Sequence, residues 1–275
     1  MSNLLQRLLT GLVAGAVAIG AVVSSAYGLW LFGLIVSLAG LWEFLKLKPI
    51  TARYSSAALV AGGLLWVVEL GMLYWVPESD VTIHLLPLLP VCFLLIALFN
   101  PQEKVPVESL GHIMLGLVYC FGPLLLFFRM GFEEGNVNPV TYDFRFPLGI
   151  LALIWTLDVG AYFGGRTFGK HPLFPRISPK KTWEGSIVGS LLCLALAGWL
   201  TTWDQTTNVH GINWLIIGVL VCVFSQLGDL VESMFKRSVS LKDSGSILPG
   251  HGGMLDRFDG LYLAAPFIFF YFFLS

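Results

Sequence analysis

Charged residues are scarce in this chain of 275 residues. The 16 Lys and Arg and the 17 Asp and Glu make up 12% of it, whereas about 25% is usual in soluble domains. The formal net charge of -1 excludes a broad electrostatic attraction to nucleic acid or to an anionic lipid surface as the organising theme. No stretch is long and polar enough for a separate soluble domain. The placement of the few charges therefore carries the functional information.

Paired cysteines are also lacking. Cys92, Cys120, Cys193 and Cys222 lie singly in or beside apolar runs, and no C-x-x-C pair occurs. This spacing argues against zinc ligands and disulfides, and it favours small packing residues. The chain has neither an internal repeat nor a low-complexity linker.

Long apolar runs fill most of the sequence, which is 56% hydrophobic with a mean hydropathy of +0.79. A membrane span needs about 20 apolar residues, and lipid offers the backbone no hydrogen-bond partner, so each run should be a helix. We predict an all-α, polytopic integral membrane protein with about nine transmembrane helices. The nine segments run from Leu4 to Ser24, Tyr27 to Leu45, Ser56 to Val76, Val81 to Phe99, Leu110 to Met130, Phe146 to Gly164, Gly185 to Trp203, Ile212 to Val231, and Gly260 to Leu274.

The first segment resembles a secretory signal peptide, because Arg7 precedes an apolar stretch that ends in small residues. We expect a retained helix instead, since the next span follows after only a few residues. Residues 1–145 would then hold spans one to five, and residues 146–275 would hold spans six to nine with the catalytic loops, in one membrane domain.

Lys and Arg distribute unevenly over the two sides that this arrangement defines. Fourteen lie at the N-terminus or in the second, fourth, sixth and eighth connections between spans, which share one side of the membrane. Only Arg129 and Arg145 lie on the other side. The positive-inside rule places the basic side in the cytoplasm. We therefore predict a cytoplasmic N-terminus and a C-terminus on the outer side.

Carboxylates and cations gather in the connection between spans eight and nine. Asp229, Glu232 and Lys236 would form one polar stripe if the helix of span eight continued past the membrane boundary. Asp256 and Asp259, at i and i+3, would share a face if the last helix began near Met254. Asp229, Asp256 and Asp259 would repel one another unless a cation relieved them, and oxygen ligands of this kind suit Mg²⁺.

A simpler interpretation is an interfacial salt bridge between Asp256 and Arg257 or a nearby lysine. It suits a single aspartate at a helix end better than three aspartates beside several cations. The turn before Asp256 adds to the functional interpretation, because Gly252 and Gly253 offer unobstructed backbone N–H groups ahead of a helix N-terminus, which suits phosphate oxygens. His251 is either a general base or a hydrogen-bonding residue.

The connection between spans six and seven holds a second cationic segment. Ser178, Lys180, Lys181 and Thr182 supply cations and hydroxyls in what we expect to be a loop constrained by proline. The positive-inside rule alone explains lysines on this side of the membrane, but it does not explain Glu184, which follows them closely in the sequence. Three further acids, Asp158, Glu43 and Glu69, lie inside apolar runs. Such acids mark functional sites or buried pairs, and Lys46 is the one partner that the sequence suggests for Glu43 or Glu69.

The stretch from Ser233 to Asp259, "SMFKRSVSLKDSGSILPGHGGMLDRFD", resembles the signature of the phosphatidate cytidylyltransferases, S-x-x-K-R-x4-K-D-x-G-x2-L-P-G-H-G-G-x-x-D-R-x-D. The blocks "DVGAYFGGRTFGKHP" and "SPKKTWEG" are also similar to that family. The resemblance covers roughly the C-terminal 120 residues, and the N-terminal half matches only as generic membrane helices.

The resemblance implies Mg²⁺-dependent transfer of a cytidylyl group from CTP to phosphatidic acid at the cytoplasmic face of a bacterial inner membrane. It also implies a homodimer and a second, monovalent cation such as K⁺. The net charge of -1 argues against a nucleic-acid partner. Asp229, Asp256 and Asp259 would hold Mg²⁺, and with Lys236 they form the expected catalytic set. The expected substrate-binding residues are Ser178, Lys180, Lys181, Thr182, Arg237, Lys242, His251, Gly252, Gly253 and Arg257.

Three alternatives remain at this point. A polyprenol kinase or an ether-lipid cytidylyltransferase would also use CTP on a lipid. A transporter of anionic solutes would line a pathway with charge, although the polar residues gather on one side. A non-catalytic scaffold would leave the convergent charge unexplained.

Overall fold

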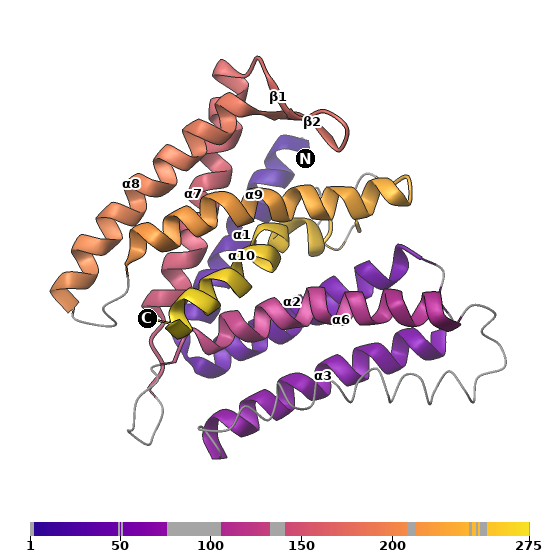
Figure 1. Cartoon of the computed structure of the whole chain (residues 1–275). Helices are drawn as coiled ribbons and strands as arrows, with labels where there is room; N and C mark the ends of the chain where they lie inside the picture. The colour runs from indigo at the N-terminus through magenta and orange to yellow at the C-terminus, as the bar shows by residue number, and fades with distance from the viewer. Residues whose placement is uncertain are drawn as a thin grey trace.

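The computed structural model describes residues 3–48, 50, 52–75, 106–132, 141–207, 213–241, 244–245, 247 and 252–274. Within these residues the chain forms helices and one small antiparallel hairpin (Figure 1). The helices are α1 (Asn3–Ser24), α2 (Ala26–Lys46), α3 (Ala52–Trp75), α6 (Pro106–Arg129), α7 (Arg145–Phe168), α8 (Trp183–Thr207), α9 (Trp214–Ser238) and α10 (Leu255–Leu274); the strands are β1 (Pro172–Phe174) and β2 (Ser178–Thr182).

The prediction of an all-α polytopic membrane protein is confirmed. Seven of the described helices, α2, α3 and α6 to α10, are long and apolar enough to cross a membrane, and α1 contains a shorter apolar helix, Leu9–Ser24. The predicted span from Val81 to Phe99 lies outside the described residues, so the expected count of nine stays a prediction.

Two predicted span ends differ clearly from the helices. We expected span eight to end at Val231, but α9 continues to Ser238, and we expected span nine to begin at Gly260, but α10 begins at Leu255. Apolar composition sets how far a span reaches into lipid, whereas the helix continues as long as its backbone groups find partners. The polar turns of both helices lie beyond the apolar runs and form the candidate site.

Close helix contacts depend on small residues. α7 and α8 form an antiparallel hairpin whose crossing contains two small-xxx-small patterns, Gly160 with Gly164 and Gly185 with Gly189. A Cβ added to Gly160 would lie 2.9 Å from the Cα of Gly189, so these backbones come nearly into contact. Small residues permit this approach between membrane helices. The closely packed α7–α8 pair carries the β1–β2 hairpin at its end, where both strands contact α8.

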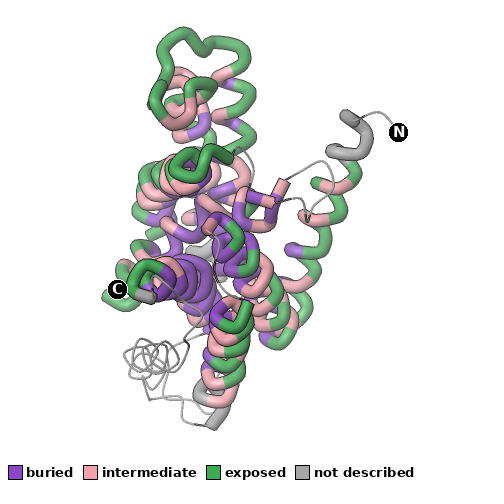
Figure 2. Tube along the Cα trace, turned by 90° about the vertical axis from the view of Figure 1, so that its right-hand side faces the viewer, coloured by how far each residue is buried: buried purple, intermediate pink, exposed green. Residues whose placement is uncertain are grey.

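Apolar side chains face both inward and outward, as a membrane bundle requires. Buried residues gather where the helices meet, and exposed positions follow their outer surfaces (Figure 2). Leu12 and Val13 of α1, and Leu191 and Trp199 of α8, are about half exposed or more. In a membrane, these exposed apolar side chains would face lipid.

Polar interactions collect at the two ends of the bundle. At one end, Lys48 follows α2 and pairs with Glu108 at the start of α6, with Nζ and Oε2 2.7 Å apart. At the other end, Arg145 binds Asp143, and the Tyr142 hydroxyl donates to the Val22 carbonyl oxygen at 2.5 Å. The first end also carries the β1–β2 hairpin, the C-terminal end of α9 and the N-terminal end of α10.

Candidate active site

The buried face of α9 changes character along its length. It begins with Trp214, Ile217 and Val221 and continues at helical spacing through Ser225, Gly228, Glu232 and Lys236. Apolar residues at this spacing pack a helix into a core, but a buried acid and a buried lysine require partners. The end of α9 is therefore built around a buried polar cluster.

Lys236 lies at the centre of that cluster. Its ammonium group contacts the Glu232 carboxylate one turn earlier on α9, and it donates to Asp256 Oδ1 of α10 at 2.5 Å. The three side chains are 11%, 0% and 10% exposed, respectively. A buried lysine between two carboxylates is held in place by charge as well as by packing. The predicted stripe from Asp229 to Lys236 is confirmed as one continuous helix.

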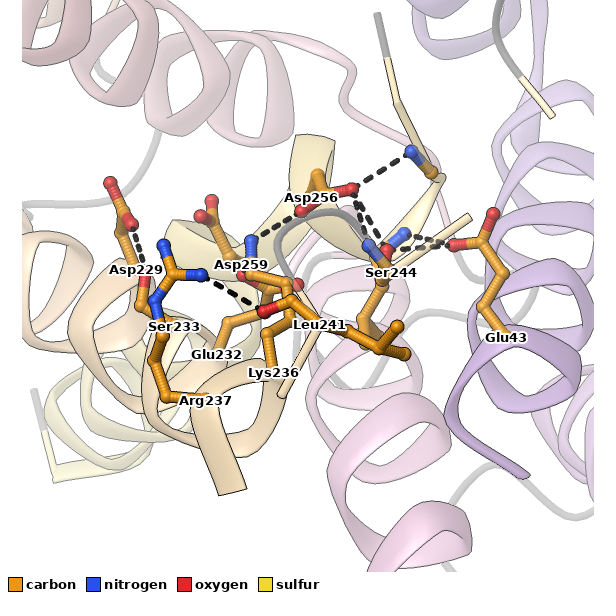
Figure 3. A network of polar contacts seen from close by, with 12 residues as sticks. Glu43, Asp229, Glu232, Ser233, Lys236, Arg237, Leu241, Ser244, Asp256 and Asp259 are labelled. Atoms are coloured by element: carbon orange, nitrogen blue, oxygen red, sulfur yellow. Dashed lines mark hydrogen bonds and ion pairs between the residues drawn. The ribbon is translucent and has the colours of Figure 1, made fainter. Parts of the chain in front are cut away.

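Asp256 is held by donors from three directions (Figure 3). Besides Lys236, its Oδ2 accepts from Ser244 N at 3.2 Å, Ser244 Oγ at 2.9 Å and Gly253 N at 2.9 Å. Gly252 has a φ of 84°, and a Cβ there would lie 2.9 Å from Asp256 Oδ2. Glycine is suited to this turn because its backbone both adopts a left-handed conformation and approaches the carboxylate closely.

A second cation–carboxylate pair joins the β1–β2 hairpin to α9. Lys181 of β2 forms an ion pair with Asp229, and their side chains are 29% and 35% exposed. Asp229 also accepts from Ser233 Oγ at 3.3 Å. Asp259 of α10 lies close enough to Asp229 and Asp158 for repulsion between like charges, and close enough to Lys181 for attraction. Segments far apart in the sequence thus bring their charges to one place.

The segment that carries Lys181 is a strand, not the loop that the sequence led us to expect. β2 pairs antiparallel with β1, with Pro172 opposite Thr182 and Phe174 opposite Ser178. Pro179 fits because a two-stranded hairpin leaves each strand with an edge that needs no ladder donor. Pairing fixes the backbone that carries both Lys180 and Lys181.

Glu184 has a structural explanation that the sequence did not reveal. Its carboxylate accepts from the backbone N–H groups of Lys170 and His171 at 3.1 and 3.2 Å, and it contacts His171 Nδ1 at 2.5 Å. Thr182 Oγ1 accepts from Gly185 N at 3.2 Å, as an N-cap does. Glu184 and Thr182 therefore fasten the two ends of the hairpin to the start of α8.

The remaining predicted site residues divide into three groups. Arg237 donates to the Leu241 carbonyl oxygen at 2.9 Å, and Arg257 interacts electrostatically with Asp158. Lys180 is exposed and Ser178 is half-buried on β2. Lys242 and His251 lie outside the described residues, so their predicted roles stay predictions.

A sequence profile of the cytidylyltransferase family matches residues 5–275 of the chain. The chain belongs to this family. It is 34% identical to the phosphatidate cytidylyltransferase of Bacillus subtilis (strain 168) over 271 residues, which cover 98% of each protein. It is 33% identical to that of Brucella suis biovar 1 over 98% of this chain and 93% of the relative, and 32% identical to that of Pseudomonas aeruginosa over 95% and 94%.

Asp256 and Lys236 both belong to the cytidylyltransferase signature. A third residue that contacts this part of the structure, Glu43 of α2, lies far outside the signature in the sequence. Glu43 is fully buried, and its Oε2 accepts from Leu255 N at 2.8 Å and from Ser244 Oγ at 3.3 Å. Lys46, the partner that the sequence suggested, instead lies over the Trp42 ring. Glu69 pairs with Arg129 on α6. For both Glu43 and Glu69, the sequence indicated a partner only through the presence of an acid inside an apolar run.

The aspartates suit a hard cation in their chemistry. Asp229, Asp256 and Asp259 offer only carboxylate oxygens, which Mg²⁺ favours. Ammonium groups already lie against two of them, Lys181 at Asp229 and Lys236 at Asp256, so a metal ion would share these carboxylates with the lysines or displace them. Among the described residues, no three His, Cys, Asp or Glu side chains are grouped to hold one ion in this arrangement. The metal assignment stays a prediction.

Proposed function

We propose that the chain transfers the cytidylyl group of CTP to phosphatidic acid, giving CDP-diacylglycerol and pyrophosphate for phospholipid biosynthesis. The observation that carries the proposal is the convergence of Lys181–Asp229 and Lys236–Asp256 at one end of an apolar bundle. Three relatives of nearly the same length bear the name phosphatidate cytidylyltransferase. Ionic groups at a membrane boundary suit a reaction between a water-soluble nucleotide and a lipid.

The reaction joins two anions. A phosphate oxygen of phosphatidic acid attacks the α-phosphorus of CTP, a new P–O bond forms, and the bond to the β-phosphate oxygen breaks as pyrophosphate leaves. The attacking phosphate is a monoester with a second pKa of about 6, so it is largely ionised at neutral pH. No strong general base is required. We therefore assign His251 to phosphate binding or to orienting an aspartate.

Charge neutralisation and positioning do most of the work in such transfers. Lys181, Lys236 and Arg257 would offset the repulsion between the substrates, with help from Lys180 and Arg237. Asp229, Asp256 and Asp259 would hold Mg²⁺, which supplies further neutralisation of the triphosphate and of the departing pyrophosphate. The Gly253 N–H already donates to Asp256 Oδ2, so of the two glycines in this turn we propose Gly252 for a backbone contact to phosphate.

The location that fits this function is the cytoplasmic face of a bacterial inner membrane, where CTP is available. The excess of Lys and Arg on one side of the chain supports this orientation. The acyl chains of phosphatidic acid would remain in lipid while the headgroup meets the polar end of the bundle. The homodimer and the monovalent cation stay predictions.

The acceptor can be tested with the purified chain, CTP, Mg²⁺ and a panel of lipid phosphates. We expect pyrophosphate release with phosphatidic acid and little with an archaeal ether-lipid phosphate. We also expect no transfer of phosphate from CTP to a polyprenol, a reaction that would release CDP instead of pyrophosphate. A preference for an ether lipid would assign the chain to another branch of CTP-dependent lipid chemistry. Solute movement across vesicles without pyrophosphate release would contradict the proposal and favour a transporter.

Lys181→Gln should lower kcat/KM for CTP by about 10-fold or more, because Asp229 loses the cation that lies against it and the triphosphate loses a positive charge. Lys170→Gln is the matched control, since Lys170 is exposed on the same connection and its described hydrogen bond uses the backbone. Steady-state pyrophosphate release measures both variants. Equal kcat/KM values in the two would remove Lys181 from the site.

A further inference from the structure

The turn that presents Asp256 is seated on one buried carboxylate from the other half of the chain. Glu43 lies on the last turn of α2, 212 residues from Leu255, whose backbone N–H donates to it. Leu255 is the first residue of α10, so this bond satisfies one of the N–H groups that a helix start leaves unpaired. A side chain of α2 therefore fixes where α10 begins.

The fit around Glu43 is closer than a single hydrogen bond requires. A Cβ added to Gly245 or to Gly253 would lie 2.7 Å from the Glu43 Cδ atom. Two glycine backbones thus enclose the carboxylate from the segment that precedes α10. A larger residue at either position would have to displace the Glu43 carboxylate or move the turn.

Ser244 connects this anchor to the candidate catalytic residue. Its hydroxyl lies 3.3 Å from Glu43 Oε2 and 2.9 Å from Asp256 Oδ2, and its backbone N–H also donates to Asp256. In Figure 3, Glu43 reaches from α2 toward Ser244, and Asp256 lies on the far side of that serine. A displacement of Glu43 would be transmitted to Asp256 both through Ser244 and through the start of α10.

We propose that Glu43 is a positioning residue that holds the Ser244–Asp256 turn in its working geometry and so sets the rate of cytidylyl transfer without contacting substrate. This inference rests on the proposed function. Misplacement of a reacting group by about 1 Å can slow a reaction about 100-fold. Glu43 would therefore affect kcat more than the KM for CTP.

The test compares Glu43→Ala and Glu43→Gln with Glu69→Gln in the purified full-length chain. Glu43→Ala should lower kcat by about 10- to 100-fold and change the KM for CTP by less than about threefold. Glu43→Gln keeps an acceptor for Leu255 N–H, so its kcat should stay within about fivefold of wild type. Glu69→Gln, a buried acid paired with Arg129 instead, should leave kcat per folded molecule unchanged.

Hydrogen exchange provides a readout that does not depend on turnover. The amides of residues 252–258 should exchange about 10-fold faster in Glu43→Ala, and at the wild-type rate in Glu69→Gln. Unchanged exchange in Glu43→Ala, or a kcat equal to that of Glu69→Gln, would overturn the proposal. If wild type makes no product from CTP and phosphatidic acid, the proposed function fails, while exchange still reports whether Glu43 holds the turn.

Two further variants separate transmission through Ser244 from general destabilisation. Ser244→Ala should lower kcat but leave the exchange of the Leu255 amide near wild type, because the Glu43 bond to that amide remains. The double variant Glu43→Ala/Ser244→Ala should be slowed by less than the product of the two single effects, since Glu43 acts on Asp256 partly through Ser244. Fully multiplicative effects would contradict that path. If Glu43→Ala does not fold, Glu43→Asp replaces it, because its carboxylate is shorter by one methylene and lies farther from the Leu255 N–H. We expect the same decrease in kcat and the same faster exchange.

Discussion

Asp256→Asn is expected to lower turnover of CTP with phosphatidic acid by about 100-fold or more. The two oxygens of Asp256 accept from Lys236, Ser244 and Gly253. An amide offers one acceptor oxygen, and it turns an NH₂ group toward one of these donors. The substitution also removes a negative charge that we assign to Mg²⁺ binding. Pyrophosphate release from purified protein, with membrane insertion verified, measures the effect.

Asp143→Asn is the matched control for this prediction. Asp143 is a largely buried acid that pairs with Arg145 at the opposite end of the bundle. Its substitution changes charge in the same way but lies away from the candidate site, so turnover should remain within about threefold of wild type. If Asp256→Asn is as active as Asp143→Asn, Asp256 neither binds metal nor organises the site.

Lys236→Met should lower the free energy of unfolding by about 3–5 kcal/mol and abolish turnover. Methionine retains an apolar stem of similar length, but it leaves Glu232, which is fully buried, and Asp256 without their shared cation. Removing one partner from a buried ionic cluster leaves uncompensated charge behind. Denaturant unfolding of the detergent-solubilised chain provides the measurement.

A compensating variant distinguishes this electrostatic cause from a packing defect. Lys236→Met/Glu232→Gln removes one of the two carboxylates that Lys236 serves, so it should regain part of the lost stability but none of the turnover. If the double variant is less stable than Lys236→Met, charge imbalance is not the reason for the loss. Wild-type stability in Lys236→Met would contradict the buried cluster itself.

Local spacing was enough to predict the part of the site that lies within single helices. Asp229, Glu232 and Lys236 repeat at helical intervals, and α9 carries them on one continuous helix as expected. The helix α10 begins at Leu255, five residues before the predicted span, and so meets the condition under which Asp256 and Asp259 were expected to share a face. Both predictions used only the geometry of one helix, which the sequence determines through its period.

Contacts between distant segments were not predictable in the same way. Glu43 and Leu255 are 212 residues apart, and nothing in a single sequence states that α2 packs against the start of α10. The sequence offered only an acid in an apolar run, which signals a partner without naming it. The β1–β2 hairpin was missed because Pro179 is typical of loops, although an edge strand also accepts proline.

The most direct test of cytidylyl transfer compares CTP labelled at the α-phosphate with CTP labelled at the γ-phosphate. Purified wild-type chain with phosphatidic acid and Mg²⁺ should place the α label in a lipid product and release the γ label as pyrophosphate. Lys236→Met should do neither. Transfer of the γ label to the lipid, with the α label remaining in a soluble nucleotide, would show a kinase and contradict the account.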